Sequence, residues 1–370
     1  MSDLTTNKSK RLVVCCDGTW NQLESSYPTN VVKFSRLIKY QTEDQRPQIV
    51  YYLSGCGTAE DAGLIERFGG GAFGWGIDRI IQEAYRFLCI NYNPDSKDEI
   101  YLVGFSRGAY IIRCLAGMMY KCGLLKRAKI REIPKAYDLY RNSNISPNDE
   151  AAIKFREENA KDPNTSENSD LDYLKYRVPI KMLGCWDTVG ALGVPDVIPW
   201  LPIAKIWNQK YEFYDPELSP IVENAFHAVA IDEKRKSFPS TPMERNKKNP
   251  NQNVEEVLFV GDHGCIGGGT KEYRGLSDYA LQWMIKKAEK LGLEFCFPTG
   301  TDTDEFEIKV DHKTEFDNSV TGIYAFGGEE LRKFTLSEVA IHHSVIKRIN
   351  DCPDYQPPNL ERNLLLNRRI

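Results

Sequence analysis

Apolar runs alternate with segments of helical periodicity along the first third of the chain. The runs RLVVCC (11–16), QIVYYL (48–53) and EIYLVGF (99–105) are typical of buried strands. Apolar side chains recur at helical spacing at positions 31, 34, 37 and 38, where Thr29 or Asn30 is the expected N-cap, and again across 77–91 and 107–122. This alternation predicts an α/β fold with a mostly parallel sheet covered by helices on both faces.

The pattern continues less regularly after residue 177. Apolar runs at 178–186 and 255–260 predict further strands, and residues 222–233 and 277–292 predict helices. A glycine-rich loop is expected at 63–76, and one helix near 337–349 is expected within an otherwise irregular C-terminal part.

Composition divides the chain further. Residues 126–177 are rich in charge, Asn, Ser and Pro, and predict a helical, solvated insertion that can cap the domain. Residues 196–220 gather Trp200, Ile203, Ile206 and Trp207 between prolines, which favours either core beneath a loop or an apolar lid that faces lipid. The expected organisation is a domain over 11–294 with a C-terminal extension, 295–370, packed on it.

The bulk properties of the 370 residues exclude several classes. A net charge of −4 provides no overall basic field for nucleic acid, and no run of 18 residues is apolar enough for a membrane span. The first residues have no apolar signal region, so we expect cytoplasmic synthesis. The ten cysteines form no C-x-x-C pair, which suits a reducing compartment, and no metal or cofactor is expected.

Ser106 stands in the sequence GFSRG, with a predicted strand directly before it and a predicted helix directly after it. The small residues Gly104, Gly108 and Ala109 allow the sharp turn that lifts a serine hydroxyl above a sheet. The alternative is a serine that merely forms a turn. The setting favours a nucleophile, with the Arg107 N–H as one donor to an oxyanion.

A serine nucleophile needs a base and an orienting acid. Of the five histidines, at 227, 263, 312, 342 and 343, only His263 follows a strongly apolar strand in a glycine-flanked turn. Asp187 ends the strand at 178–186 in the same way, and the order Ser, Asp, His is that of α/β hydrolases. Asp232 and Asp262 are the alternative acids. The loop after the first strand, DGTW, supplies a second oxyanion donor from the N–H of Gly18 or Thr19.

Three other motifs have plainer interpretations. Cys265 could join Asp262 and His263 around a metal, but the sequence has no second cluster of ligands. The glycine-rich loop lacks the G-K-[ST] of a phosphate-binding loop. Asp17 could be an acid or a metal ligand, but the sequence favours an aspartate that forms a turn by bonding its own loop.

Seven motifs in order resemble a widespread α/β-hydrolase domain family that includes the first class of type VI secretion lipase effectors, which are phospholipases. They are LVVCCDGTWN, PTNVVKFSRLI, GGAFGWGIDRIIQEAYRFL, YLVGFSRGAY, WDTVGALGVP, VENAFHAVAIDEKRKSFPST and LSDYALQWMI. The resemblance covers about residues 11–290 and implies an α/β-hydrolase fold, a triad of Ser106, Asp187 and His263, and action on glycerophospholipids. The family's histidine loop has an acid two residues after the histidine, where this chain has Cys265.

The sequence therefore predicts a serine hydrolase of carboxylic esters that needs no cofactor, and the resemblance favours lipid acyl esters as substrates. Its expected partners are an ester or phospholipid substrate, a transient membrane surface, and a cognate inhibitor if the protein is a toxin delivered by a secretion system. A small-ester or thioester hydrolase is one alternative. A hydrolase-fold binding module without activity is another.

Overall fold

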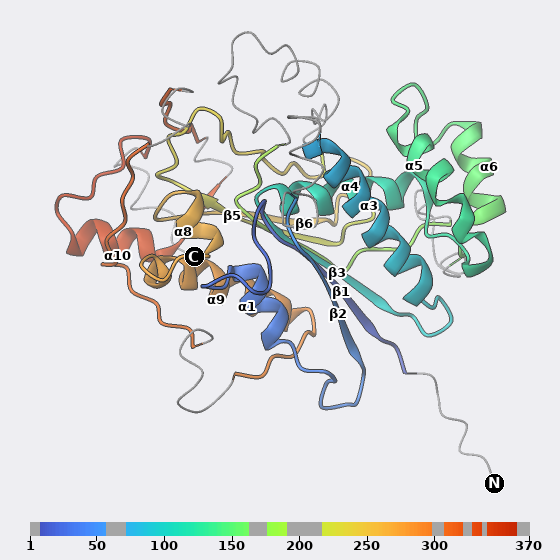
Figure 1. The fold of residues 1–370 in the computed structure, drawn as a ribbon, viewed down its shortest axis with the longest axis horizontal. Helices are drawn as coiled ribbons and strands as arrows, with labels where there is room; N and C mark the ends of the chain where they lie inside the picture. The colour runs from blue at the N-terminus through green and yellow to red at the C-terminus, as the bar shows by residue number, and fades with distance from the viewer. Residues whose placement is uncertain are drawn as a thin grey trace.

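In a computed structural model, the described residues are organised around one parallel sheet of seven strands (Figure 1). The structure describes residues 8–56, 72–162, 176–190, 217–297, 307–320, 328–334 and 339–360. The sheet order is β2-β1-β3-β4-β5-β6-β7. The strands are β1 (Arg11–Cys16), β2 (Gln48–Leu53), β3 (Glu99–Phe105), β4 (Met182–Trp186), β5 (Asn224–Ala230), β6 (Asn253–Phe259) and β7 (Ala340–Ile341).

Every neighbouring pair in this sheet is parallel. The register places Cys16 opposite Gly104, and Phe105 opposite Trp186, so β1, β3 and β4 end side by side. The loops that follow these strands therefore meet at one edge of the sheet, where α/β proteins build their sites.

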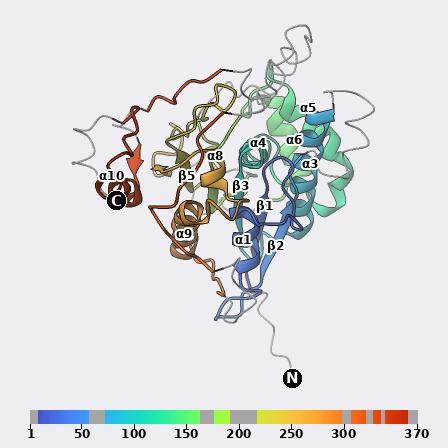
Figure 2. The same cartoon turned by 60° about the vertical axis from the view of Figure 1, so that its left-hand side comes forward.

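Helices cover both faces of the sheet, as predicted for an α/β-hydrolase fold. Figures 1 and 2 show α1 (Asn30–Leu37) and α9 (Arg274–Lys290) on one face, and α3 (Ala72–Asn91) and α4 (Arg107–Cys122) on the other. Two apolar clusters, one for each face, are formed by alternate residues of the same strands. Among the described residues, no helix is both long and apolar enough to cross a bilayer.

The described part of residues 126–177 forms η1 (Arg127–Glu132), α5 (Ile133–Arg141) and α6 (Glu150–Asn159). The expectation that this segment is solvated rather than core is wrong for α5, because Ile133, Ala136 and Tyr137 are buried in the cluster beneath α3 and α4. A role of the segment as a cap stays a prediction.

The helix expected at 222–233 is wrong, because residues 224–230 form β5. Strand β5 lies between β4 and β6 with both faces covered, so apolar side chains occur on both faces, at 225, 226 and 228–230, and the period of two that identifies a half-buried strand is lost. His227 consequently lies on a strand rather than in a helix. Two smaller differences concern α3, which begins at Ala72 inside the loop expected at 63–76, and α10 (His343–Asp351), which is preceded by β7.

Other predicted features fall where they were expected. Thr29 caps α1, its side chain accepting a hydrogen bond from the Val32 N–H, and Gly123 ends α4 with a positive φ of 70°. The lid-like segment 196–220 lies outside the described residues except for its last four residues, as does the part of the glycine-rich loop before residue 72. After residue 294, β7 pairs with β6 and so joins the C-terminal extension to the sheet.

A buried ion pair joins the two helices on one face of the sheet. Lys33 of α1 and Asp278 of α9 are both fully buried, with 2.8 Å between Lys33 Nζ and Asp278 Oδ1. Asp278 also accepts a hydrogen bond from the Lys309 N–H at 2.8 Å. Because water cannot reach either charge, Lys33 depends on Asp278 for compensation, and Asp278 depends on Lys33 together with the more distant Arg274.

We expect Lys33→Met to lower the free energy of unfolding by about 3 kcal/mol, because the buried Asp278 carboxylate loses its closer cation and keeps only Arg274, whose Nε lies 3.4 Å from Asp278 Oδ2. Urea denaturation followed by circular dichroism measures the change. Lys181→Met, which removes the partly exposed ion pair with Glu223, is the matched control and is expected to cost less than Lys33→Met. Equal losses in the two variants would contradict the structural role of the Lys33 pair.

Candidate active site

Ser106 occupies a strained turn between β3 and α4. Its backbone angles are φ 57° and ψ −123°, a conformation that residues other than glycine rarely adopt. The turn is possible because Gly108 has no side chain: a Cβ there would lie 2.1 Å from the carbonyl oxygen of Cys16 on β1. This packing holds the elbow against β1 and fixes the direction of the serine hydroxyl.

The structure brings Ser106, His263 and Asp187 into one hydrogen-bonded chain. The Ser106 Oγ lies 2.8 Å from His263 Nε2, and His263 Nδ1 lies 2.6 Å from Asp187 Oδ2. An ionised Asp187 only accepts hydrogen bonds, so the imidazole carries its proton on Nδ1 and accepts the serine hydroxyl at Nε2. The residues come from the ends of β3 and β4 and from the first residue of α8 (His263–Gly267), which follows β6.

Asp187 is fully buried, yet it is held in its charged form. Burial by itself would raise the pKa of this carboxyl, but the charge of Arg332 and the hydrogen bonds from His263 and Arg332 outweigh burial and bring the pKa below its usual range. Oδ1 also accepts from the Ala230 N–H at 2.9 Å. The carboxylate is thus oriented from three sides.

The imidazole of His263 is fixed by its neighbours. Its ring centroid lies 4.6 Å from that of Phe105 and 5.1 Å from that of Phe238, so two aromatic rings exclude water from it. The backbone N–H of His263 donates to Glu233 Oε2 at 3.2 Å, and this hydrogen bond anchors the start of α8. Glu233 is in turn paired with Arg235 at 2.6 Å. The base is therefore buried at 7% exposure and locked in one orientation.

The alternative acids have other partners. Asp232 Oδ2 accepts from the Gly261 N–H at 2.7 Å and from the Tyr355 hydroxyl at 2.8 Å. Asp262 caps α8 by accepting from the Cys265 N–H. Both ring nitrogens of His263 already contact Ser106 and Asp187, so neither points to a metal beside Asp262 and Cys265.

The oxyanion donors predicted from the sequence divide into two groups. Arg107 opens α4, and a helix leaves its first N–H groups without partners inside the helix. In the DGTW loop, the Gly18 N–H donates to Asp17 Oδ1 at 2.7 Å and is therefore engaged. In the described part of the chain, no hydrogen bond is formed by the Thr19 N–H, which makes it the better candidate of the two.

Asp17 organises this loop. Besides the Gly18 N–H, its carboxylate accepts from the hydroxyls of Thr29 and Tyr52, each at 2.7 Å. Burial raises the pKa of Asp17 to about 6, although the three hydrogen bonds lower it. The turn expected at Asp17 is present, and the residue also ties the loop to α1 and β2.

A second buried histidine, His227, supports the loop that carries the acid. Its Nδ1 lies 2.6 Å from Glu256 Oε2, and its Nε2 accepts from the N–H of Thr188, the residue after Asp187, at 2.9 Å. No local pattern in the sequence points to this role. Histidines 312 and 342 have other surroundings: His312 pairs with Asp351, and burial lowers the pKa of His342 to about 3.

Comparison with known proteins identifies one family. The family model described as the catalytic domain of Tle1-like type VI secretion phospholipase effectors matches residues 10–287. An uncharacterised protein of Saccharomyces cerevisiae, YEL023C, is 27% identical over 254 residues, which are 64% of this chain and 34% of that protein. The chain thus spans about a third of that relative's length.

Three solved structures are similar at low identity. An uncharacterised protein from Pseudomonas aeruginosa has a TM-score of 0.43 at 18% identity, covering 82% of this chain and 49% of its own. The Tle1 effector bound to the VgrG spike of a type VI secretion system has a TM-score of 0.42 at 15% identity, covering 81% and 76%. A putative carboxylesterase from Lactobacillus plantarum has a TM-score of 0.34 at 11% identity, covering 79% and 89%.

The environment of Asp17 predicts a pH-dependent effect of its substitution. The pKa of Asp17 is raised in the folded protein, from 3.8 to about 6, so its charged form opposes folding as pH rises through this window. The neutral Asp17→Asn variant avoids that cost. Relative to wild type, its free energy of unfolding should therefore increase by up to about 3 kcal/mol between pH 4 and pH 7.

Urea denaturation at four or five pH values measures this difference. Asp95→Asn, at an exposed position, is the control. A difference between wild type and Asp17→Asn that stays constant with pH would show that Asp17 is not a buried, titrating carboxyl.

Proposed function

Because the chain belongs to the family of Tle1-like catalytic domains of type VI secretion phospholipase effectors, we propose that it cleaves lipid acyl esters through an acyl-enzyme on Ser106. Membership of this family places it generally among lipases and ester hydrolases. The serine mechanism, the residues that carry it and the phospholipid substrate are the proposal.

One observation carries the proposal: the continuous chain of hydrogen bonds from Ser106 through His263 to Asp187. Its three members come from separate strand ends, and the serine stands on a strained turn. The sequence alone selected the same three residues. This arrangement is the one that activates a serine hydroxyl in unrelated hydrolases.

In the proposed mechanism, His263 Nε2 takes the hydroxyl proton as Ser106 Oγ attacks the ester carbonyl. Asp187 holds the imidazole in position and stabilises the imidazolium that forms. Collapse of the tetrahedral intermediate expels the alcohol, which receives the proton from His263, and leaves an acyl group on Ser106. Water, deprotonated by His263, then releases the fatty acid.

The negative charge on the carbonyl oxygen needs preorganised donors. We assign this role to the N–H groups of Arg107 and Thr19, while Gly18 shapes the loop through its bond to Asp17. The close contact of the elbow with β1 supports this pairing, because it keeps the turn at Ser106 beside the loop that follows β1.

Two other functions make different predictions. A small-ester or thioester hydrolase would lose activity as the acyl chain lengthens and would be indifferent to micelles. A binding module without activity would not react with active-site probes. The three-residue hydrogen-bond chain favours an enzyme, and the family favours a lipid ester.

The proposed partners follow from the same reading. A phospholipase acts on molecules in a membrane, so we propose transient contact with a membrane surface. The Tle1 structure is a complex with a VgrG spike. Delivery by a secretion system is part of the proposal for this chain, together with neutralisation by a cognate inhibitor if the protein is a toxin.

We expect Ser106→Ala to abolish covalent labelling by a fluorophosphonate probe and to lower kcat for p-nitrophenyl esters by at least about 10⁴-fold. Loss of the Oγ removes the nucleophile without disturbing the fold. Gel fluorescence and ester hydrolysis measure the two effects. Ser240→Ala, in the loop after β5, is the control and should label like wild type. Labelling that persists in Ser106→Ala would place the nucleophile elsewhere.

The lipid preference predicts a response to aggregation of the substrate. The rate of hydrolysis of dihexanoyl-phosphatidylcholine should rise steeply when its concentration crosses the critical micelle concentration. A pH-stat or fatty-acid assay follows the reaction. A rate that saturates smoothly through that concentration, together with efficient cleavage of p-nitrophenyl acetate, would favour the small-ester hydrolase.

A further inference from the structure

Arg332 is a buried arginine whose guanidinium grips the carboxylate of Asp187. Nη1 donates to Oδ1 at 2.6 Å, and Nη2 donates to Oδ2 at 3.0 Å. Arg332 is 8% exposed and Asp187 is 0% exposed, so the pair is shielded from water. A two-pronged arginine–carboxylate pair fixes orientation as well as charge. Oδ2 is also the atom that accepts from His263, which links Arg332 directly to the imidazole's partner.

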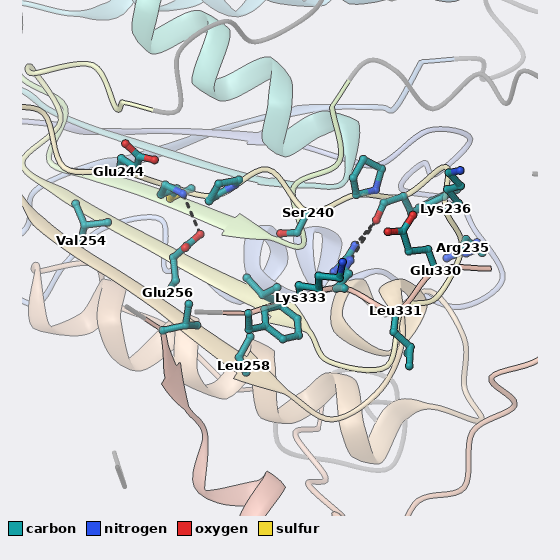
Figure 3. Close-up of a pocket in the computed structure, with 18 of the residues that line it drawn as sticks. Arg235, Lys236, Ser240, Glu244, Val254, Glu256, Leu258, Glu330, Leu331 and Lys333 are labelled. Carbon is teal, nitrogen blue, oxygen red and sulfur yellow. Dashed lines mark hydrogen bonds between the residues drawn. The ribbon is translucent and has the colours of Figure 1, made fainter. Parts of the chain in front are cut away.

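Arg332 belongs to residues 328–334, which we call the strap. The strap lies beyond residues 10–287, the part of the chain that the family model matches. It runs along the segment after β5: the Lys236 N–H donates to the Gly328 carbonyl at 3.2 Å, and the Glu330 N–H donates to the Lys234 carbonyl at 2.7 Å. Figure 3 shows Glu330, Leu331 and Lys333 of the strap beside Arg235 and Lys236.

The guanidinium is held on its other sides as well. The Phe238 carbonyl accepts from Nη2 at 2.8 Å and from Nε at 3.2 Å. The carbonyl of Arg332 itself accepts from Asn359 Nδ2, which also donates to the Ile231 carbonyl at 2.9 Å. Because Phe238 packs on His263, one residue contacts both the arginine and the imidazole. These contacts hold the guanidinium of Arg332 in position against Asp187.

We propose that Arg332, supplied by the C-terminal strap, is a positioning residue that aligns the Asp187 carboxylate for His263 and keeps it charged. The inference rests on the proposed serine hydrolase mechanism and extends it to a part of the chain outside the matched catalytic domain. The strap thereby completes the site, because without it the fully buried carboxylate would lose its only ion-pair partner besides His263 among the described residues.

The charges around His263 determine in which direction the loss of Arg332 shifts the pH dependence of activity. Arg332 offsets the charge of Asp187, and Arg235 offsets that of Glu233. Removing the charge of Arg332 leaves Asp187 free to favour the protonated imidazole, which cannot act as a base. The charged side chains that act on this pair are Arg332 of the strap on Asp187 and Glu233 of the loop after β5 on His263, and Arg235 in turn pairs with Glu233. Other titratable residues adjoin them along the chain: Arg107 follows Ser106, Asp262 and Cys265 flank His263, and Asp232 precedes Glu233.

A cavity of about 910 Å³ is lined by Arg332 but not by Asp187. Its walls are the strap and residues 235–245, with Val254, Glu256 and Leu258 of β6 at its base (Figure 3). Arg332 both lines this cavity and contacts Asp187. A small cation that enters the cavity could therefore take the place of a deleted guanidinium.

The first test compares the pH dependence of kcat/KM in Arg332→Met, Arg332→Lys and wild type. For Arg332→Met we expect the acidic limb to move to higher pH by about one unit, since the offsetting charge is gone. Arg332→Lys keeps the charge but not the two-pronged contact, so its limb should stay near that of wild type while kcat falls. Lys333→Met, at the exposed neighbouring position, is the matched control and should behave as wild type. An acidic limb of kcat/KM at the same pH in Arg332→Met and wild type would overturn the proposal.

The second test is chemical rescue of Arg332→Ala. Guanidinium chloride at about 10 mM, far below denaturing concentrations, should restore part of the lost kcat, whereas NaCl or urea at the same concentration should not. Guanidinium should have no effect on Arg332→Lys. Failure of guanidinium to restore any activity to a folded Arg332→Ala would count against a direct role of the charge.

A third readout is independent of activity and separates this inference from the proposed function. In Arg332→Met the buried Asp187 carboxylate loses its arginine partner. The decrease in the urea midpoint relative to wild type should therefore be greater at pH 7 than at pH 4.5, because protonation of the carboxylate at the lower pH removes the uncompensated charge. If wild type cleaves no ester but this difference is present, the proposed function fails and the role of Arg332 stands. If the loss is the same at both pH values, the role of Arg332 fails.

Discussion

The site depends on one constraint, a carboxylate that is charged although no water reaches it. Asp187 has 0% exposure, and a charge in such a place must be compensated by its neighbours. The structure provides a guanidinium, an imidazole N–H and a backbone N–H, each from a different segment of the chain. Those segments are the strap, α8 and β5. The need to satisfy one carboxylate therefore draws together residues that are up to 145 positions apart.

The parallel sheet makes this convergence possible. Because all strands point the same way, β1, β3 and β4 bring the DGTW loop, the serine elbow and Asp187 to one edge. Glycines then allow close approach where side chains would collide. At Gly267, for example, a Cβ would lie 2.0 Å from the ring of Phe105, the ring that packs on His263. The order of the strands and the small residues at their ends thus determine how closely the hydroxyl, the imidazole and the carboxylate can approach one another.

Much of this was predictable because the informative residues lie next to the strands. Ser106, Asp187 and His263 each follow an apolar run. These runs form β3, β4 and β6, which lie in the same order across the sheet as along the chain. The sequence pattern was therefore enough to predict which three residues come together. The engagement of Gly18 by Asp17 was not, since only coordinates show which N–H of a tight loop points inward.

Arg332 and His227 were missed for physical reasons. Arg332 stands in the sequence ELRKF between a leucine and a lysine, and nothing local distinguishes an arginine that reaches a buried carboxylate from one on the surface. His227 was assigned to a helix because β5 is buried on both faces and shows no alternation. In both cases the role is created by long-range packing, through Phe238 for the arginine and through Glu256 and Thr188 for the histidine.

The covalent intermediate is the most direct test of the account. Wild-type protein mixed with a phospholipid and quenched in acid within milliseconds would be digested and examined by mass spectrometry. If Ser106 is the nucleophile, the peptide containing Ser106 carries an acyl group whose mass corresponds to that of the fatty acid released. Release of fatty acid while that peptide remains unmodified at every quench time, with the acyl group on another residue, would contradict the role of Ser106 as the nucleophile.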